Sequence, residues 1–169
     1  MSKKIQKRTF RKKSEIYKPQ ILTCPYCGAK AILRPVSYLF GTDVTPGNSS
    51  YFYVCTNYPE CNTYIGCYKN NFAPKGQLAS PWLRYRRNVA HRYIDIITHK
   101  GIMYQENIYN AIACKLGLTS NQAHIRHSTD YSIEKIIEIL KEILDNHGVK
   151  YNEKFIESSS YLRKREQAV

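Results

Sequence analysis

The clearest hydrophobic pattern in this chain lies between residues 133 and 144, where apolar side chains recur at every third or fourth position. Glutamate and lysine occupy most of the positions between them. This spacing places the apolar side chains on one face of an α-helix and the charged ones on the other. The apolar positions are Ile133, Ile136, Ile137, Leu140, Ile143 and Leu144. The pattern therefore predicts an amphipathic helix that ends near Gly148.

Weaker patterns of the same period predict further helices upstream. One helix ends at Lys100-Gly101, and its apolar face consists of Trp82, Val89, Tyr93, Ile96 and Ile97. A second covers about residues 108–116 and is ended by Gly117. Thr119 or Ser120 is suited to cap a short third helix that runs to about His127. A bundle of three or four helices is expected.

Between residues 21 and 68 the pattern changes to short runs of β-branched and aromatic residues, which are typical of strands. Strands are expected at residues 31–34, 51–54 and 64–66, and a turn-rich connection joins the first two. A sheet this small buries too little apolar surface to fold alone. We therefore expect a bound metal ion to replace part of the missing core.

Four cysteines flank these strands with the spacing of a metal site. Two residues separate Cys24 from Cys27, and Gly28 follows, which lets the chain turn so that backbone N–H groups point at sulfur. Five residues separate Cys55 from Cys61. Two cysteine pairs on opposing turns supply the tetrahedral thiolate ligands that Zn²⁺ prefers. We predict one structural zinc ion held by Cys24, Cys27, Cys55 and Cys61.

Two cysteines remain. Cys67 repeats the five-residue gap after Cys61. It is either a buried residue of the third strand or the fourth ligand in place of Cys61. Cys114 lies among the apolar positions of the second helix, so we expect it to pack in the helical core.

These elements give an α+β fold, in which a small β zinc ribbon precedes the helix bundle. The expected organisation follows the changes in composition along the chain. It consists of a flexible basic arm at 1–19, the zinc ribbon at 20–70, a linker at 71–80, a helical domain at 81–148 and a polar tail at 149–169.

The residues around the cysteines resemble two known groups of proteins. The Cys-Pro-Tyr-Cys-Gly segment at 24–28 and the run from Tyr53 to Cys61 are similar to the C-terminal zinc ribbons of bacterial type IA topoisomerases. Those ribbons bind single-stranded DNA, and some contact RNA polymerase. The topoisomerase resemblance covers the ribbon alone.

A second resemblance extends over about residues 21–144. It is to a zinc-finger-containing family of uncharacterised function that occurs mostly in phages and prophages. The residues that carry it, besides the cysteine segments, are Tyr64-Ile65-Gly66-Cys67, Gly76-Gln77-Leu78-Ala79, His91, Leu116-Gly117-Leu118 and His124-Ile125. This resemblance implies the ribbon, the zinc ion and a phage-encoded protein, and it implies no particular activity.

Positive charge is concentrated in two places. The 169 residues carry a formal net charge of +13, and the sequence pI is about 9.5. The basic residues considered for phosphate contacts are Lys3, Lys4, Lys7, Arg8, Arg11, Lys12 and Lys13 in the arm, with Arg84, Arg86 and Arg87 in the first long helix. Charge clustered in this way favours a nucleic-acid partner, because each cation placed on a phosphate releases counterions. The alternative is a solubilising tail without a fixed partner.

Two other features are candidates for contacts with bases. Alternation along the second strand places Tyr51 and Tyr53 on one face of the sheet, where tyrosines either stack on bases or form the core. Residues 112–127 have the pattern of a helix-turn-helix. In that arrangement the side chains that would face a groove are Ser120, Asn121, Gln122, His124 and Arg126, and Asn121, Gln122 and Arg126 are the candidates for nucleic-acid contacts. Two helices joined by glycine also occur in plain bundles, so both alternatives stay open.

The function expected from the sequence is non-catalytic nucleic-acid binding in the cytoplasm, with the choice between DNA and RNA open. The main alternative is a protein-interaction factor that docks on a host or viral machine such as RNA polymerase or the ribosome. A third is a metal-dependent nuclease, which His91, His124 and His127 suggest, although no acidic cluster or nucleophile motif accompanies them. No apolar run of about 18 residues is present, so no membrane partner is expected.

Overall fold

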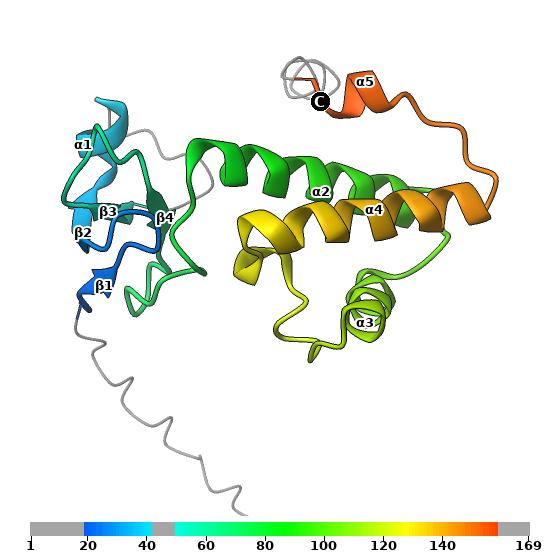
Figure 1. Ribbon diagram of the computed structural model, residues 1–169, viewed down its shortest axis with the longest axis horizontal. Coiled ribbons are helices and arrows are strands. Elements are labelled where there is room, and N and C mark those ends of the chain that lie inside the picture. Colours follow the sequence, from blue (N-terminus) through cyan, green and yellow to red (C-terminus); the bar gives the residue numbers. More distant parts are fainter. Residues whose placement is uncertain (1–18, 42–49, 159–169) are drawn as a thin grey trace, which may run out of the picture.

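The computed structural model describes residues 19–41 and 50–158, which form a small antiparallel sheet beside a group of helices (Figure 1). The α+β prediction is confirmed, with the sheet preceding the long helices in the chain. The expected basic arm, and with it every lysine and arginine assigned to phosphate contacts there, lies outside the described residues.

The sheet has four strands in the order β1-β2-β3-β4, and each neighbouring pair is antiparallel. The strands are β1 (Leu22–Thr23), β2 (Lys30–Pro35), β3 (Tyr51–Cys55) and β4 (Tyr64–Gly66). Pairing of Ala31 with Cys55 and of Val54 with Tyr64 sets the register. Because the strands that pair are also neighbours in the chain, the two turns that carry the cysteines lie at one end of the sheet.

Two elements of the ribbon were not predicted. The short strand β1 pairs Leu22 with Ala31, and the helix α1 (Val36–Phe40) follows β2 directly. Pro35 precedes α1 in an extended conformation, and Gly41 ends it at φ 69°. The helix buries Val36 against Phe52 and Val54 of β3, which gives the sheet a small core of its own. A pattern of five residues is too short to reveal such a helix in the sequence.

Residues 71–80, expected to be a linker, instead fold back along the sheet. Isolated bridges pair Tyr64 with Ala79 and Cys67 with Pro74. Leu78 and Ala79 are buried. This segment therefore extends the ribbon beyond β4 and carries it directly into the first long helix.

The helix α2 (Pro81–His99) ends where its sequence predicts, and it begins with a side-chain cap that the sequence analysis did not identify. Ser80 Oγ accepts a hydrogen bond from the backbone N–H of Leu83 at 3.1 Å, and proline occupies the first helical position. Lys100 is the C-cap residue. Trp82, predicted to share the apolar face, is 46% exposed instead and lies in the first turn of the helix.

The helix α3 (Gln105–Leu116) ends at Gly117, which has φ 64°, as its sequence predicts. Cys114 is exposed, so the prediction that it packs in the core is wrong. The helix α4 (Asp130–Asn146) begins with a reciprocal cap between Thr129 and Ser132, and all six apolar positions of its predicted stripe are buried. In Figure 1, α2 and α4 lie side by side and α3 lies below them.

The short third helix expected from residue 119 to 127 is absent. In a single turn, the backbone N–H of Ala123 donates a hydrogen bond to the carbonyl of Thr119. His124 then adopts an extended conformation. The 3-10 turn η2 (Ile125–His127) comes next. Because His124 is extended, the side chain of Ile125 lies in the core. Burial of Ile125 thus takes the place of the second helix of a helix-turn-helix, so of the two open alternatives the described residues fit the plain helix bundle.

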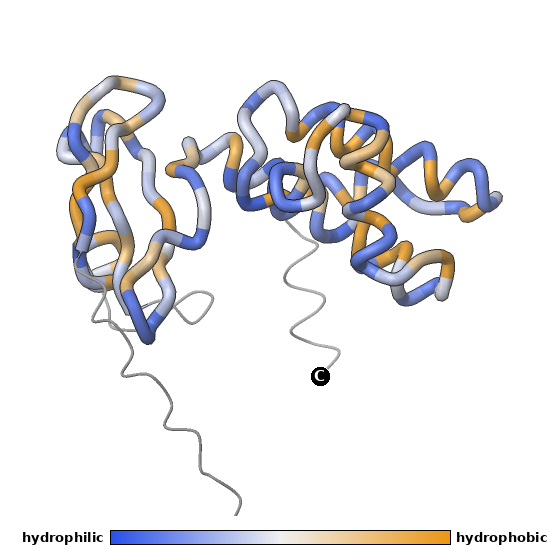
Figure 2. The backbone as a smooth tube through the Cα atoms, turned by 90° about the horizontal axis from the view of Figure 1, so that it is seen from below, coloured by the Kyte–Doolittle hydropathy of each residue, from blue (hydrophilic) through white to orange (hydrophobic). Residues whose placement is uncertain are grey.

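Residues 149–158 of the expected polar tail pack on the helices. The helix α5 (Glu153–Ile156) buries Ile156 in the main core, and Arg92 Nη1 donates hydrogen bonds to the carbonyls of Ile156 and Ser158. Figure 2 shows hydrophobic stretches on the strands and along the helices. The helices that the structure describes include none with the length and apolar content to cross a bilayer.

Candidate metal centre and nucleic-acid interface

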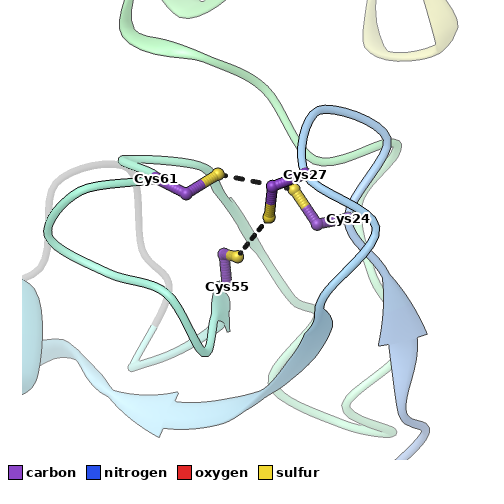
Figure 3. Close-up of side chains that lie close together, drawn as sticks. All are labelled: Cys24, Cys27, Cys55 and Cys61. Atoms are coloured by element: carbon purple, nitrogen blue, oxygen red, sulfur yellow. Dashed lines mark hydrogen bonds between the residues drawn. The ribbon is translucent and has the colours of Figure 1, made fainter.

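The four predicted zinc ligands converge at one end of the sheet (Figure 3). Cys24 and Cys27 lie in the turn between β1 and β2, Cys55 is the last residue of β3, and Cys61 lies in the turn before β4. The turn at Cys24 is closed by hydrogen bonds from Gly28 N–H to Cys24 O and from Cys24 N–H to Ala29 O. Gly28 has φ 73°, a conformation in which a Cβ atom would be strained.

The arrangement of sulfur atoms fits a tetrahedral zinc ion. All four Sγ atoms lie within 4.8 Å of one another. Cys24 Sγ is 3.7 Å from Cys61 Sγ, and Cys27 Sγ is 3.4 Å from Cys55 Sγ. Zinc bonded to four thiolates at about 2.3 Å holds their sulfur atoms about 3.8 Å apart. Four soft ligands leave no open position, so this is a closed structural site rather than a catalytic one.

Polar groups lie beside two of the sulfur atoms, those of Cys24 and Cys27. Thr63 Oγ1 lies 3.1 Å from Cys24 Sγ, and Asn57 Nδ2 donates to Cys27 Sγ at 3.7 Å. Burial would raise the pKa of Cys24, but the Thr63 hydroxyl and the backbone N–H groups of Tyr26 and Cys27 lower it to about 6. These donors stabilise the thiolate that metal binding requires.

Cys61, rather than Cys67, completes the site. Cys67 is buried directly after β4, where its thiol donates a hydrogen bond to the carbonyl of Tyr51 at 3.3 Å. Burial raises the pKa of the Cys67 thiol, which keeps it protonated. Within the described ranges, these four cysteines are the one set of three or more potential metal ligands that lie close together. His91, His124 and His127 form no such group there.

Arg84, Arg86 and Arg87, the helical arginines predicted to contact phosphates, all make contacts within the protein. Arg87 is buried and donates hydrogen bonds to Ser128 and to the carbonyl of Gln77. Arg86 pairs with Glu134 and Glu157, and its side chain is 11% exposed. Arg84 donates to the carbonyls of Asn62 and Ala79. Helical spacing places arginines on a face, but only the packing of that face decides whether solvent reaches them.

The residues predicted to contact bases lie in different parts of the structure and do not form one surface. Tyr53 is buried and its hydroxyl donates to the carbonyl of Phe72 at 2.9 Å, so it belongs to the ribbon core. Tyr51 is partly exposed and its ring meets Phe72 edge-on. Asn121 and Gln122 lie on the exposed turn after α3, and Arg126 lies in η2 against Tyr68. No groove-reading helix carries these last three.

A different set of side chains forms two groups of aromatic and arginine contacts on the α1 side of the sheet. We call it the aromatic–arginine face, and it consists of Arg34, Tyr38, Phe40, Tyr58, Tyr64 and Arg84. Arg34 Cζ lies 5.1 Å from the Tyr38 ring centroid, and the Tyr38 and Tyr58 centroids are 5.8 Å apart. Arg84 Cζ lies 3.6 Å from the Tyr64 centroid. The tyrosines are visible in the sequence, but α1, which brings Tyr38 and Phe40 to this surface, is not.

Charge is distributed unevenly between the two parts of the protein. Across the described residues of 19–80 the charged side chains are Lys30, Arg34, Lys69, Lys75 and one acid, Glu60. The helices carry acidic side chains in almost equal number to basic ones, and Arg86, Arg87 and Arg92 are mostly buried. The exposed excess of positive charge therefore lies on the ribbon.

Comparison with known proteins agrees with this site. A family model described as a zinc-finger-containing domain matches residues 20–143, which is most of the chain. The match spans both the ribbon and the helices up to α4. No curated protein and no solved structure matches the chain.

Proposed function

The chain belongs to a family of zinc-finger-containing domains, and from that premise we propose that its ribbon binds single-stranded nucleic acid on the aromatic–arginine face. The observation that carries the proposal is the exposure of Tyr38, at 46%, beneath the guanidinium of Arg34. An exposed ring flanked by a cation offers a base a stacking surface and its phosphate a counter-charge. Unpaired bases fit such a surface because their faces are accessible.

The zinc ion supports this role by fixing the sheet on which the rings lie. It stabilises the ribbon and takes no part in the contact. Binding is proposed to be non-catalytic, since the zinc site is closed and the described histidines do not converge on a second metal.

The proposal is tested by the fluorescence anisotropy of labelled oligonucleotides, single-stranded and duplex, of DNA and RNA. We expect single strands to bind more tightly than duplexes. Affinity is expected to fall as salt rises from about 50 to 200 mM. Tyr38→Ala removes one stacking ring and is expected to weaken single-strand binding about tenfold.

Tyr104→Ala is the matched control, because Tyr104 is 83% exposed but lies at the start of α3. Arg34→Gln is expected to reduce the salt dependence by about one counterion. Equal losses for Tyr38→Ala and Tyr104→Ala would contradict the proposed surface. Affinity for duplexes equal to that for single strands would exclude base stacking as its mechanism.

A further inference from the structure

A second group of cationic and hydrogen-bond donor side chains lies where the ribbon meets the helices. We call it the junction site, and it consists of Tyr68, Lys75, His124, Arg126 and His127. Arg126 Nη1 donates a hydrogen bond to Tyr68 Oη at 2.9 Å, and Lys75 Nζ lies 5.9 Å from the Tyr68 ring centroid. The ring of His124 stacks on Tyr109, with centroids 4.5 Å apart and planes at 16°. These contacts hold the group in place from both sides.

The backbone of Gly76 and Gln77, in the segment that follows β4, contacts the backbone of Arg126. Gln77 N–H donates to Arg126 O at 3.3 Å. A Cβ atom at Gly76 would lie 2.3 Å from that same oxygen, so only glycine permits this approach. The backbone of Arg126 is therefore fixed, and its guanidinium is held against Tyr68 of the ribbon rather than free in solvent.

Arg126 differs from the other interior arginines in what it lacks. The guanidinium groups of Arg84, Arg87 and Arg92 donate to carbonyls, and that of Arg86 pairs with two carboxylates. Among the residues that the structure describes, the Arg126 guanidinium donates to neither a carbonyl nor a carboxylate: its Nη1 donates to the Tyr68 hydroxyl, and its Nε is buried without a hydrogen bond. A buried, unpaired guanidinium donor calls for an acceptor.

The neighbours of Arg126 are donors as well. Tyr68 Oη accepts the hydrogen bond from Arg126, which leaves its own hydroxyl hydrogen to donate elsewhere. His124 Nδ1 accepts the backbone N–H of Arg126, which places the ring proton of neutral His124 on Nε2. Burial lowers the pKa of His124, and the positive charges of Arg126, His91 and His127 lower it further. Positive charge and hydrogen-bond donors thus gather around Arg126.

We infer that the junction site binds a phosphate group. Phosphate offers several acceptor oxygens and a negative charge, and the planar arginine fork matches its geometry. Arg126 would supply the paired donors, while the Tyr68 hydroxyl and the His124 ring would each donate one hydrogen bond. Lys75 adds positive charge on the ribbon side. The source of the phosphate is either a nucleic-acid backbone or a small phosphomonoester, and both present the same oxygens.

The test uses the zinc-loaded full chain and NMR signals of the histidine rings. Inorganic phosphate is titrated against sodium chloride at equal ionic strength. We expect the His124 and His127 signals to shift saturably with phosphate and not with chloride. Arg126→Gln is expected to weaken phosphate binding at least about tenfold, because it removes the charge and the fork.

Two further variants separate this inference from the proposed function. Tyr68→Phe keeps the ring and removes the hydroxyl, so it should weaken phosphate binding several-fold even if Arg126→Gln unfolds the protein. Arg34→Gln, on the aromatic–arginine face, should leave phosphate binding unchanged. Shifts identical in phosphate and chloride, or full phosphate affinity in a folded Arg126→Gln protein, would overturn the inference.

Competition identifies the source of the phosphate. Displacement of inorganic phosphate by a nucleoside monophosphate alone assigns a small phosphomonoester. Displacement by a trinucleotide without terminal phosphates assigns the backbone of a strand. Loss of strand binding in Tyr38→Ala with phosphate binding intact would show that the two surfaces act independently.

Discussion

At the scale of single residues, a few side chains of unusual environment decide how this protein is built. A Cβ atom added at Gly76 would meet the backbone oxygen of Arg126, whereas one added at Gly28 or Gly117 would meet no other part of the chain. Arg87 connects the same two segments, because its guanidinium donates hydrogen bonds to the carbonyls of Gln77 and Ser128. Backbone atoms of Gly76, Gln77 and Arg126 thus take part in the contact between ribbon and helices, together with side chains such as Arg87.

Gly76→Ala should therefore destabilise the protein by about 1–3 kcal/mol, because the loop must move away from Arg126. The midpoint of urea unfolding measures this change in the free energy of unfolding. Gln77→Ala is the control, since the Gln77 side chain is exposed and its contacts are backbone contacts. Equal midpoints for the two variants would show that the close approach is not maintained in solution.

At the scale of elements, the short helix α5 depends on ionic contacts as well as on Ile156. Glu157 pairs with Arg86 at 3.0 Å and with Lys141 at 3.1 Å. Burial would raise the pKa of Glu157, but hydrogen bonds from Lys141 and Arg86 lower it below its ordinary value of 4.5. A carboxyl group with a lowered pKa stabilises the folded state above its unfolded pKa, and this contribution is lost as pH falls through the folded pKa.

Glu157→Gln should accordingly destabilise the protein by about 1–2 kcal/mol at pH 7, and the difference from wild type should shrink below about pH 4. Thermal unfolding across this pH range tests the prediction. Glu138→Gln is the control, because Glu138 is mostly exposed and pairs with Lys135 within α4. A pH-independent difference for Glu157→Gln would show that its charge does not hold α5.

At the scale of the whole molecule, two cores are stabilised in different ways. The helical core contains the buried faces of α2, α3 and α4 with Ile156. On the α1 side of its sheet, the ribbon has a small cluster of buried residues, Val36, Phe52 and Val54. The second is too small to hold its sheet without the zinc ion, whereas the first needs no metal.

Removal of zinc should for this reason unfold the ribbon and leave most helical structure in place. A chelator, or Cys55→Ser, should abolish stoichiometric zinc and collapse the NMR signals of β2 and β3 while far-UV circular dichroism stays largely helical. Cys114→Ser should keep zinc and fold, since Cys114 is exposed. Complete loss of helical signal would show instead that the two cores unfold together.

Much of this architecture can be predicted from short segments of the sequence. The cysteine spacing identifies the zinc ligands because metal geometry tolerates few arrangements, and the α4 stripe identifies its helix because burial requires that period. The sequence near Arg84, Arg86, Arg87 and Tyr53 does not determine whether these side chains are exposed. Whether a charge or a ring faces solvent depends on which distant segment packs over it, and the folding back of residues 71–80 supplies a large part of that cover.

The same division holds for the candidate binding surfaces. The sequence alone determines the zinc site and the positive charge, because both follow from residue type and spacing. Only the tertiary structure decides that α1 places Tyr38 beside Tyr58 and Phe40 beside Tyr64, and that the ribbon approaches Arg126 at Gly76. Those contacts join residues that are far apart in the chain, and no local period or motif encodes which surfaces will meet when two small cores pack together.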